Sequence, residues 1–281
     1  MEEARRVQKL RAERLAKTKA KVAPVLWQYG ALARLDAEDT LERLVYGNYS
    51  TSSFGYNGLY ETTKCLTGKD FWKDGETYQL AKDILQFLND LCEEFKKEDN
   101  IAYSLYGTPG ESLNGKFGLC IREHFGEDVF KELDGHDREY LTNSCHIPVW
   151  EHIDVFSKLG CEADLQKLSL GGNIVYCESV DMSKNLEAVE TVMDFIYDTN
   201  IYAEINCETS YCEKCGSFNT IHLTGEMGNY VPTCSHCGNT DRSKMNYAVR
   251  VCGYISTNAF TQQRAGDIND RYKHLDNKVM E

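Results

Sequence analysis

Apolar positions alternate between helical and extended spacing over the first 205 residues of the chain. Residues 77–97 and 186–197 carry apolar side chains at helical intervals. Short segments without helical spacing lie between them and are expected as strands or extended segments, at 48–56, 101–105, 141–149, 173–177 and 201–205. This alternation predicts an α/β architecture. Four or five strands are fewer than a closed barrel needs, so we expect another polypeptide segment to complete the unit.

The first 30 residues are rich in Ala, Leu, Arg, Lys and Glu, which favours one long helix over residues 2–29. Pro24 alone interrupts this composition, and Gly30 is a suitable stop. A further short helix is expected to open at Asp39 and run through Leu44. The long helix is either a solvated N-terminal element or the continuation of a missing polypeptide.

The character of the sequence changes after Asn206. Gly, Cys, Thr and Asn dominate to about residue 243, and helical periodicity disappears. We therefore predict three parts: residues 1–205 as the α/β part with the N-terminal helix, 206–243 as a small separate module, and 244–281 as a loop and tail.

Charge and cysteine content narrow the classes of function. The formal net charge is -13, which disfavours general binding to nucleic acid. No apolar run is long enough to span a bilayer, and residues 1–21 lack the apolar centre of a secretory signal. The chain has 12 cysteines without an export signal, which indicates metal binding in a reducing compartment, the cytoplasm. Eight of them are scattered, and apart from Cys207 and Cys252, which lie inside the C-terminal motifs, most of these are expected to be small buried hydrophobic residues.

Four cysteines form two close pairs with the spacing C-x2-C-x18-C-x2-C, at Cys212, Cys215, Cys234 and Cys237. Each pair can direct two thiolates at one ion, and the glycine after each pair permits the tight turn. This array predicts a closed, tetrahedral zinc ribbon, with iron as the main competitor. Such a site has no open position for catalysis, so its metal is structural. We interpret His236 as a bystander.

Residues 246–256 are unusually apolar for a loop and contain the run Arg-Val-Cys-Gly-Tyr at 250–254. Taken alone, Gly253 would be a turn glycine in a buried strand. The combination of the thiolate ribbon, this run and residues 269–274 resembles the C-terminus of the anaerobic (class III) ribonucleotide reductases. Further similar segments follow the same order upstream, at 49–61, 104–113, 142–144, 171–174 and 205–206.

The resemblance implies that the chain is the C-terminal half of a ten-stranded α/β barrel with a zinc ribbon. It implies a stable backbone radical at Gly253, generated by an activase that uses S-adenosylmethionine and an iron–sulfur cluster. The substrates would be ribonucleoside triphosphates. The cysteine that attacks the substrate would lie on the N-terminal half, here a partner chain of a split enzyme. Cys252 could pass a hydrogen atom, but packing explains it equally well.

The chemistry of a backbone radical requires glycine. The unpaired electron is shared between amide and carbonyl and is most stable in a planar arrangement, which a side chain would crowd. We also expect the radical to be buried, because Val249, Val251, Tyr254 and Ile255 flank it.

Residues 107–113 are the best candidate for substrate binding, through Gly107, Thr108, Gly110, Glu111 and Ser112. A glycine-rich turn that opens a helix presents amides to a phosphate. The equally weighted alternative is a capped helix start, with Thr108 as N-cap, Pro109 at the first position and Glu111 in a capping box.

Two alternatives to a reductase subunit remain. One is a glycyl radical replacement protein, although such proteins are much shorter. The other is a zinc-ribbon binding module without catalysis, which would need a basic face that the charge balance does not support.

Overall fold

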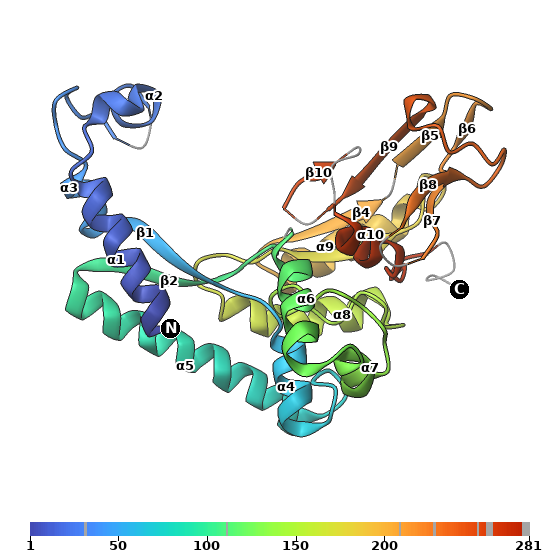
Figure 1. The fold of residues 1–281 in the computed structure, drawn as a ribbon, viewed down its shortest axis with the longest axis horizontal. Coiled ribbons are helices and arrows are strands. Elements are labelled where there is room, and N and C mark those ends of the chain that lie inside the picture. The colour runs from blue at the N-terminus through green and yellow to red at the C-terminus, as the bar shows by residue number, and fades with distance from the viewer. Residues whose placement is uncertain are drawn as a thin grey trace. The chain divides into compact units, whose positions relative to one another are not determined.

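The structure is a computed structural model that describes residues 1–30, 33–110, 112–207, 209–226, 229–251, 253–256 and 261–276. The chain divides into two compact units, and α5 (Gly75–Asp99) contributes residues to both (Figure 1). The first unit contains residues 1–55, 83–106 and 168–172. The second contains residues 56–82, 107–167 and 173–281.

The first unit is built on two paired strands and the later part of α5. Its elements are α1 (Glu2–Ala16), η1 (Ala20–Val22), α2 (Pro24–Trp27), α3 (Glu42–Val45), β1 (Gly47–Tyr56) and most of β2 (Ile101–Gly107). Phe54, Phe95 and Tyr103 pack ring against ring in its core. Arg5 lies over the Phe95 ring and pairs with the Asp99 carboxylate at 2.7 Å, which fastens α1 to α5.

The expectation of one helix over residues 2–29 is wrong. The helix α1 ends at Ala16, because the next residues pair their backbone with residues 39–41. The Ala20 amide donates to the Asp39 carbonyl, and the Leu41 amide donates to Thr18. Pro24 does not interrupt a helix but begins α2, and the short helix expected from Asp39 begins at Glu42. Non-local backbone pairing has overridden helix propensity here.

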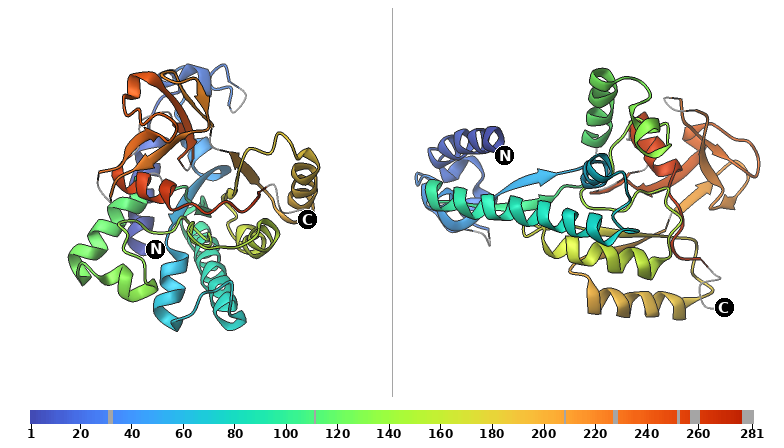
Figure 2. Two further views of the ribbon diagram at one scale, coloured as in Figure 1. Left: turned by 90° about the vertical axis from the view of Figure 1, so that its right-hand side faces the viewer. Right: turned by 90° about the horizontal axis from the view of Figure 1, so that it is seen from below.

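The α/β part of the second unit contains the parallel strands β3 and β4 with α8 and α9 packed on them (Figure 2). Val175 to Ser179 pair in register with Ala203 to Cys207. Leu159, Val175 and Leu275 are fully buried in the shared core. The elements are α4 (Leu59–Thr67), α6 (Leu113–Phe125), α7 (Val129–Asp134), α8 (Val155–Lys167), β3 (Val175–Ser179), α9 (Leu186–Thr199) and β4 (Ala203–Cys207).

The remaining elements form a small β module with one helix. In Figure 1 the strands β10, β9, β5 and β6 follow one another in a sheet, and β7 pairs with β8. One apolar core joins Cys212, Tyr247 and Val249 to Ile268 of the helix. The elements are β5 (Thr209–Cys212), β6 (Ser217–Phe218), β7 (Ile221–Thr224), β8 (Val231–Cys234), η2 (Arg242–Lys244), β9 (Met245–Arg250), β10 (Ile255–Ser256) and α10 (Gln262–Asn269).

The mixed α/β class and most expected elements are confirmed, with two further corrections. Residues 141–149, expected as an extended segment, are interrupted by a turn at Ser144, whose φ is 34°. Of the six scattered cysteines to which the expectation of burial applied, Cys92, Cys145 and Cys177 are buried, Cys161 is partly buried, and Cys65 and Cys120 are exposed. The expectation therefore holds for half of them. No helix of the described ranges is long and apolar enough to cross a bilayer.

Candidate active site and metal centre

The two cysteine pairs meet at one point of the β module, as their spacing predicts. The sulfur atoms of Cys212, Cys215, Cys234 and Cys237 all lie within 4.8 Å of one another. Cys212 and Cys237 are 3.7 Å apart, as are Cys215 and Cys234. Four sulfurs placed about 2.3 Å from a tetrahedral zinc ion would be roughly 3.8 Å apart. The residues therefore fit a closed four-thiolate metal site.

The surroundings of two of the four cysteines, Cys215 and Cys234, favour thiolates. The hydrogen bond with the Asn239 backbone lowers the pKa of Cys237, but burial and the neighbouring cysteine sulfurs outweigh it and raise that pKa to about 12. The hydroxyl of Ser217 lies 3.4 Å from the sulfur of Cys215, and this contact is the main cause that lowers the pKa of Cys215 to about 5. The sulfur of Cys234 lies 3.3 Å from the Thr220 hydroxyl. The turns after each pair need Gly216 and Gly238, whose φ values are 73° and 67°. Metal binding requires deprotonated sulfur, so the environment of Cys215 and Cys234 suits it.

A strand connects the four-cysteine site to the loop that contains Gly253. Cys212 on β5 pairs with Met245 at the start of β9, and the pairing continues from Thr209 to Ala248. β9 then pairs with β10, with Arg250 opposite Ile255. The Val251 amide donates to the Tyr254 carbonyl at 2.9 Å, so Gly253 lies in the short link of a hairpin. The module thus supports the base of this loop.

The expected burial of the loop is only partly correct. Val249 and Val251 are buried at 4% and 2% exposure. Gly253 itself is exposed, and Tyr254 and Ile255 are 46% and 64% exposed. The described residues therefore leave residues 253–255 of the hairpin open to solvent. Cys252 lies outside the described residues.

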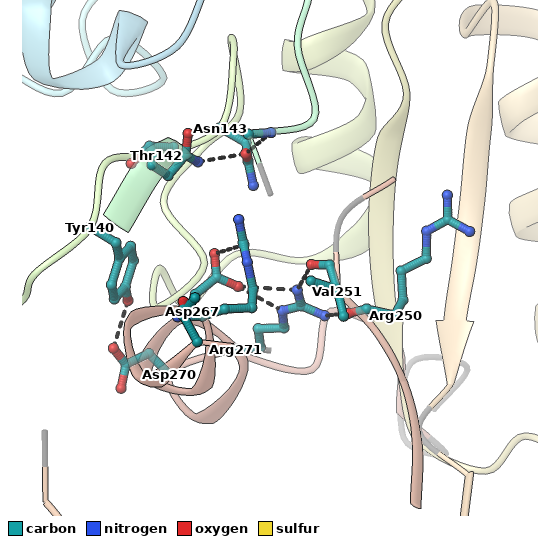
Figure 3. Close-up of polar contacts among 12 residues, drawn as sticks. Tyr140, Thr142, Asn143, Arg250, Val251, Asp267, Asp270 and Arg271 are labelled. Carbon is teal, nitrogen blue, oxygen red and sulfur yellow. Dashed lines mark hydrogen bonds and ion pairs between the residues drawn. The ribbon is translucent and has the colours of Figure 1, made fainter. Parts of the chain in front are cut away.

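Arg271 anchors this loop to the body of the second unit (Figure 3). Its Nη1 and Nη2 donate to the carbonyl oxygens of Arg250 and Val251, each at 2.7 Å. On its other side it pairs with Asp267 of α10 at 3.0 Å and with Glu178 of β3 at 3.2 Å. One buried side chain therefore ties the loop to both a helix and a strand.

A cavity of about 40 Å³ borders the loop, enough for a few water molecules. Lys158, His274, Arg271 and Val251 line parts of it, as does Asn143. Asn143, which lines the cavity, also accepts a hydrogen bond from the Gly110 amide of the glycine-rich turn described below.

Two buried groups behind this cavity are held in fixed charge states. Lys158 lies 2.7 Å from both carboxylate oxygens of Glu162. Burial opposes ionisation of Glu162, but the charges of Lys158 and His146 prevail and lower its pKa to about 2. Burial lowers the pKa of His274 to about 3, so its ring is neutral. Its Nδ1 accepts from the Glu178 amide, so Nε2 carries the hydrogen and has no partner within the described residues.

The glycine-rich turn differs from both readings of the sequence. The helix α6 begins at Leu113 with Ser112 at the N-cap position, so Thr108 is not the cap. Glu111 lies outside the described residues. The Gly110 amide, expected to face a phosphate, donates to the Asn143 side chain at 2.8 Å. Gly107 ends β2, where an added Cβ would lie 2.0 Å from the Asn173 side chain. A role of this turn in substrate binding stays a prediction.

Two groups of residues were missed by sequence reasoning. Arg271 appeared there only as part of a motif, without a function, because the loop carbonyls and Glu178 that it bonds lie 20 or more positions away in the chain; only Asp267 is near in sequence. Lys158 and Glu162 offered a usable signal, since opposite charges four residues apart interact on a helix. The burial of these two side chains could not be predicted from the sequence.

The fold first places the protein in a class. A solved anaerobic ribonucleotide reductase aligns with 80% of this chain and 34% of its own, at a TM-score of 0.57 and 19% identity. The anaerobic ribonucleotide reductase from Thermotoga maritima, solved with glycerol in the active site, aligns with 74% of this chain and 32% of its own, at a TM-score of 0.53 and 19% identity. At this identity, the similarity shows a shared fold.

Sequence comparison then defines the family. The profile described as anaerobic ribonucleoside-triphosphate reductase matches residues 1–274. The enzyme of that name from Enterobacteria phage T4 is 34% identical over 94% of this chain, and that from Escherichia coli is 32% identical over 98%. The chain therefore belongs to the anaerobic ribonucleoside-triphosphate reductase family, a family of enzymes. It spans 41% and 38% of the length of these two relatives.

Proposed function

We propose that this chain is the radical-carrying C-terminal portion of an anaerobic ribonucleoside-triphosphate reductase, with the radical stored at Gly253. The observation that carries the proposal is the hairpin of residues 251–254. It places Gly253 on a loop held by Arg271 and by the strand that pairs with Cys212. An activase with S-adenosylmethionine and an iron–sulfur cluster would remove one hydrogen atom from the Gly253 Cα. Cys252 is retained as a candidate for hydrogen transfer.

The four cysteines would hold a structural zinc ion, which supplies rigidity rather than a reactive position. The work of this chain's own residues is to hold the loop in place and to keep the buried charges beside it paired. We keep the three-part division at 205 and 243, the barrel half, the cytoplasmic location and the substrate role of Gly107, Thr108, Gly110, Glu111 and Ser112 as parts of the same proposal.

The exposure of the radical loop supports a partner that covers it. Tyr254 and Ile255 present apolar surface there. A second apolar hollow lies along α9 and β4, where Tyr197, Ile201 and Tyr202 are exposed at 89%, 69% and 53%. Within the described residues β4 pairs only with β3, so its other edge is available to a further strand. We assign this surface to the N-terminal portion of the reductase, which would carry the catalytic cysteine.

Anaerobic activation tests the proposal. The chain is combined with the N-terminal portion and an activase, and electron paramagnetic resonance is recorded. We expect a doublet that collapses to a singlet when the protein is labelled with α-deuterated glycine, and cleavage at Gly253 in air. Gly253→Ala should abolish both, whereas Gly75→Ala should leave both unchanged, because an added Cβ at Gly75 meets nothing within 4 Å.

Other outcomes would point to the alternatives. A doublet that survives in Gly253→Ala would overturn the assignment of the radical to this residue. Metal binding without any radical in the wild-type chain would favour a zinc-ribbon binding module. Radical transfer to an oxygen-cleaved reductase without the upstream 205 residues would favour a replacement protein.

A further inference from the structure

One guanidinium group bonds the two carbonyl oxygens that precede the glycyl loop. Arg271 donates from Nη1 to the Arg250 carbonyl and from Nη2 to the Val251 carbonyl, each at 2.7 Å. In a regular strand successive carbonyls point to opposite edges. Here two successive carbonyls face one planar group, so the chain leaves the β9 ladder at this point. Arg271 therefore fixes the orientation of the peptide plane from which the loop starts.

The Arg271 guanidinium is itself held by two carboxylates. Its Nε and Nη2 donate to one oxygen of Asp267 at 3.1 and 3.0 Å, and Nη1 lies 3.2 Å from Glu178. The other oxygen of Asp267 accepts from Arg264 at 2.6 Å, and Glu178 accepts from Asn206 at 2.7 Å. The Arg271 side chain is 8% exposed and its two carboxylate partners are 3% and 8% exposed. Little freedom is left to the group.

Only arginine supplies this arrangement. A lysine carries a single ammonium group and cannot span two carbonyls and two carboxylates in one plane. Hydrogen bonds to charged groups contribute about 1.5–3 kcal/mol each. Breaking the pair of carbonyl bonds should therefore raise the open population of the loop by about tenfold or more.

We propose that Arg271 is a positioning residue, which sets the geometry of the glycyl loop through the Arg250 and Val251 carbonyls and is itself oriented by Asp267 and Glu178. The use of this positioning, to hold Gly253 where the radical is made and used, rests on the proposed function. The loop geometry itself can be tested without a radical.

Hydrogen exchange on the metal-loaded chain provides the first test. The reporter is the Val251 amide, which donates to Tyr254 and is followed in the peptide covering residues 246–256. Arg271→Gln should accelerate its exchange by about tenfold or more, with the slow exchange of the core strand β3 preserved. Arg271→Lys should give an exchange rate between those of the wild type and Arg271→Gln, because the charge remains while the second carbonyl contact is lost. Unchanged exchange in both variants would overturn the proposal.

Arg122→Gln is the matched control. Arg122 is another half-buried arginine of the same unit that bonds two carboxylates, Glu127 and Asp137, and one carbonyl, that of Arg138. Replacement of Arg122 should leave the exchange rate of the Val251 amide unchanged. If Arg271→Gln does not fold, Arg271→Lys decides the question alone. A variant that speeds exchange everywhere, β3 included, would show a merely structural role and contradict the proposal.

A spectroscopic readout separates positioning from stability. In the activated complex, Arg271→Lys should change the hyperfine splitting of the glycine doublet, because the splitting depends on the local geometry of the radical. Arg122→Gln should not change it. An identical doublet in Arg271→Lys would overturn the positioning role. If the wild-type chain gives no doublet, the proposed function fails while the exchange result still stands.

Discussion

Two glycine-bearing segments each follow a strand of the fold, yet they are held in opposite ways. The turn at residues 107–110 is packed from within. A Cβ on Gly110 would lie 1.8 Å from Asn114, whose side chain is buried and bonded to Asn143. The loop at residues 251–254 is instead held at its base, through the carbonyls that Arg271 bonds, and Gly253 is exposed.

The difference shows two separate reasons for glycine. At residue 110 the requirement is spatial, and packing alone accounts for it. At residue 253 the site is exposed, and the reason that we propose for glycine is the radical chemistry. The predictions below test whether the two segments can be disturbed independently.

The largest effect is expected from removal of the metal. Cys215→Ser deletes one thiolate and should reduce bound zinc from one ion per chain to none, as measured by plasma mass spectrometry. Structural zinc contributes about 10–16 kcal/mol to the folding of zinc-finger peptides. Exchange should therefore become fast over residues 209–256, while the Gly110 amide stays protected. Cys65→Ser, at an exposed cysteine, is the control. An equal increase of exchange in both glycine-bearing segments would show that they cannot be disturbed independently.

Acid is expected to weaken the turn at residues 107–110, whereas metal removal weakens the loop at residues 251–254. Glu162 accepts from the Ile147 amide at 2.8 Å and so supports the segment that contains Asn143. Its pKa is about 2 in the folded chain against an ordinary 4.5, so this stabilisation is complete above pH 4.5 and is lost as the pH falls toward 2. That shift corresponds to about 3 kcal/mol.

Glu162→Gln should therefore lower the free energy of unfolding by about 3 kcal/mol near pH 7 and flatten its decline below pH 4.5. Urea titrations between pH 3 and pH 7 measure this. Lys158 and His146 are the basic groups that face Glu162, at 2.7 and 3.3 Å. Glu127→Gln, at an exposed carboxylate, should leave the profile unchanged. A steep acid decline in Glu162→Gln would refute the assignment.

The smallest effects should come from the glycines themselves. Gly110→Ala should cost about 1–3 kcal/mol, because the buried Asn114 cannot move aside cheaply. Gly253→Ala should alter stability by less than about 0.5 kcal/mol, as expected of an exposed site. Gly75→Ala serves again as the open-space reference. Urea unfolding ranks the three variants, and a loss in Gly253→Ala as large as in Gly110→Ala would contradict the comparison.

Local patterns in the sequence were sufficient where the structure depends on local spacing. The helix expected at 77–97 is α5, and the strands expected at 173–177 and 201–205 are β3 and β4 within two residues. The meeting of the four cysteines also follows from their spacing. Each of these features depends on periodicity or on short-range turns.

Features that depend on distant partners could not be predicted in the same way. Helix α1 stops because residues 18–20 pair with residues 39–41, and the Gly110 amide is taken by Asn143, 33 positions away. The function of Arg271 arises from Glu178 and Val251 together, which no window of sequence brings side by side.

The segment that carries Arg271 also has a consequence for the order of folding. The amides of His274 and Leu275 donate to the Glu178 carbonyl, and the His274 ring accepts from an amide 96 positions earlier. Closing so large a loop is entropically costly until the β module between its ends has formed. We therefore expect this pairing to be among the last steps of folding. The glycine loop would then acquire its fixed geometry only once the rest of the unit is native.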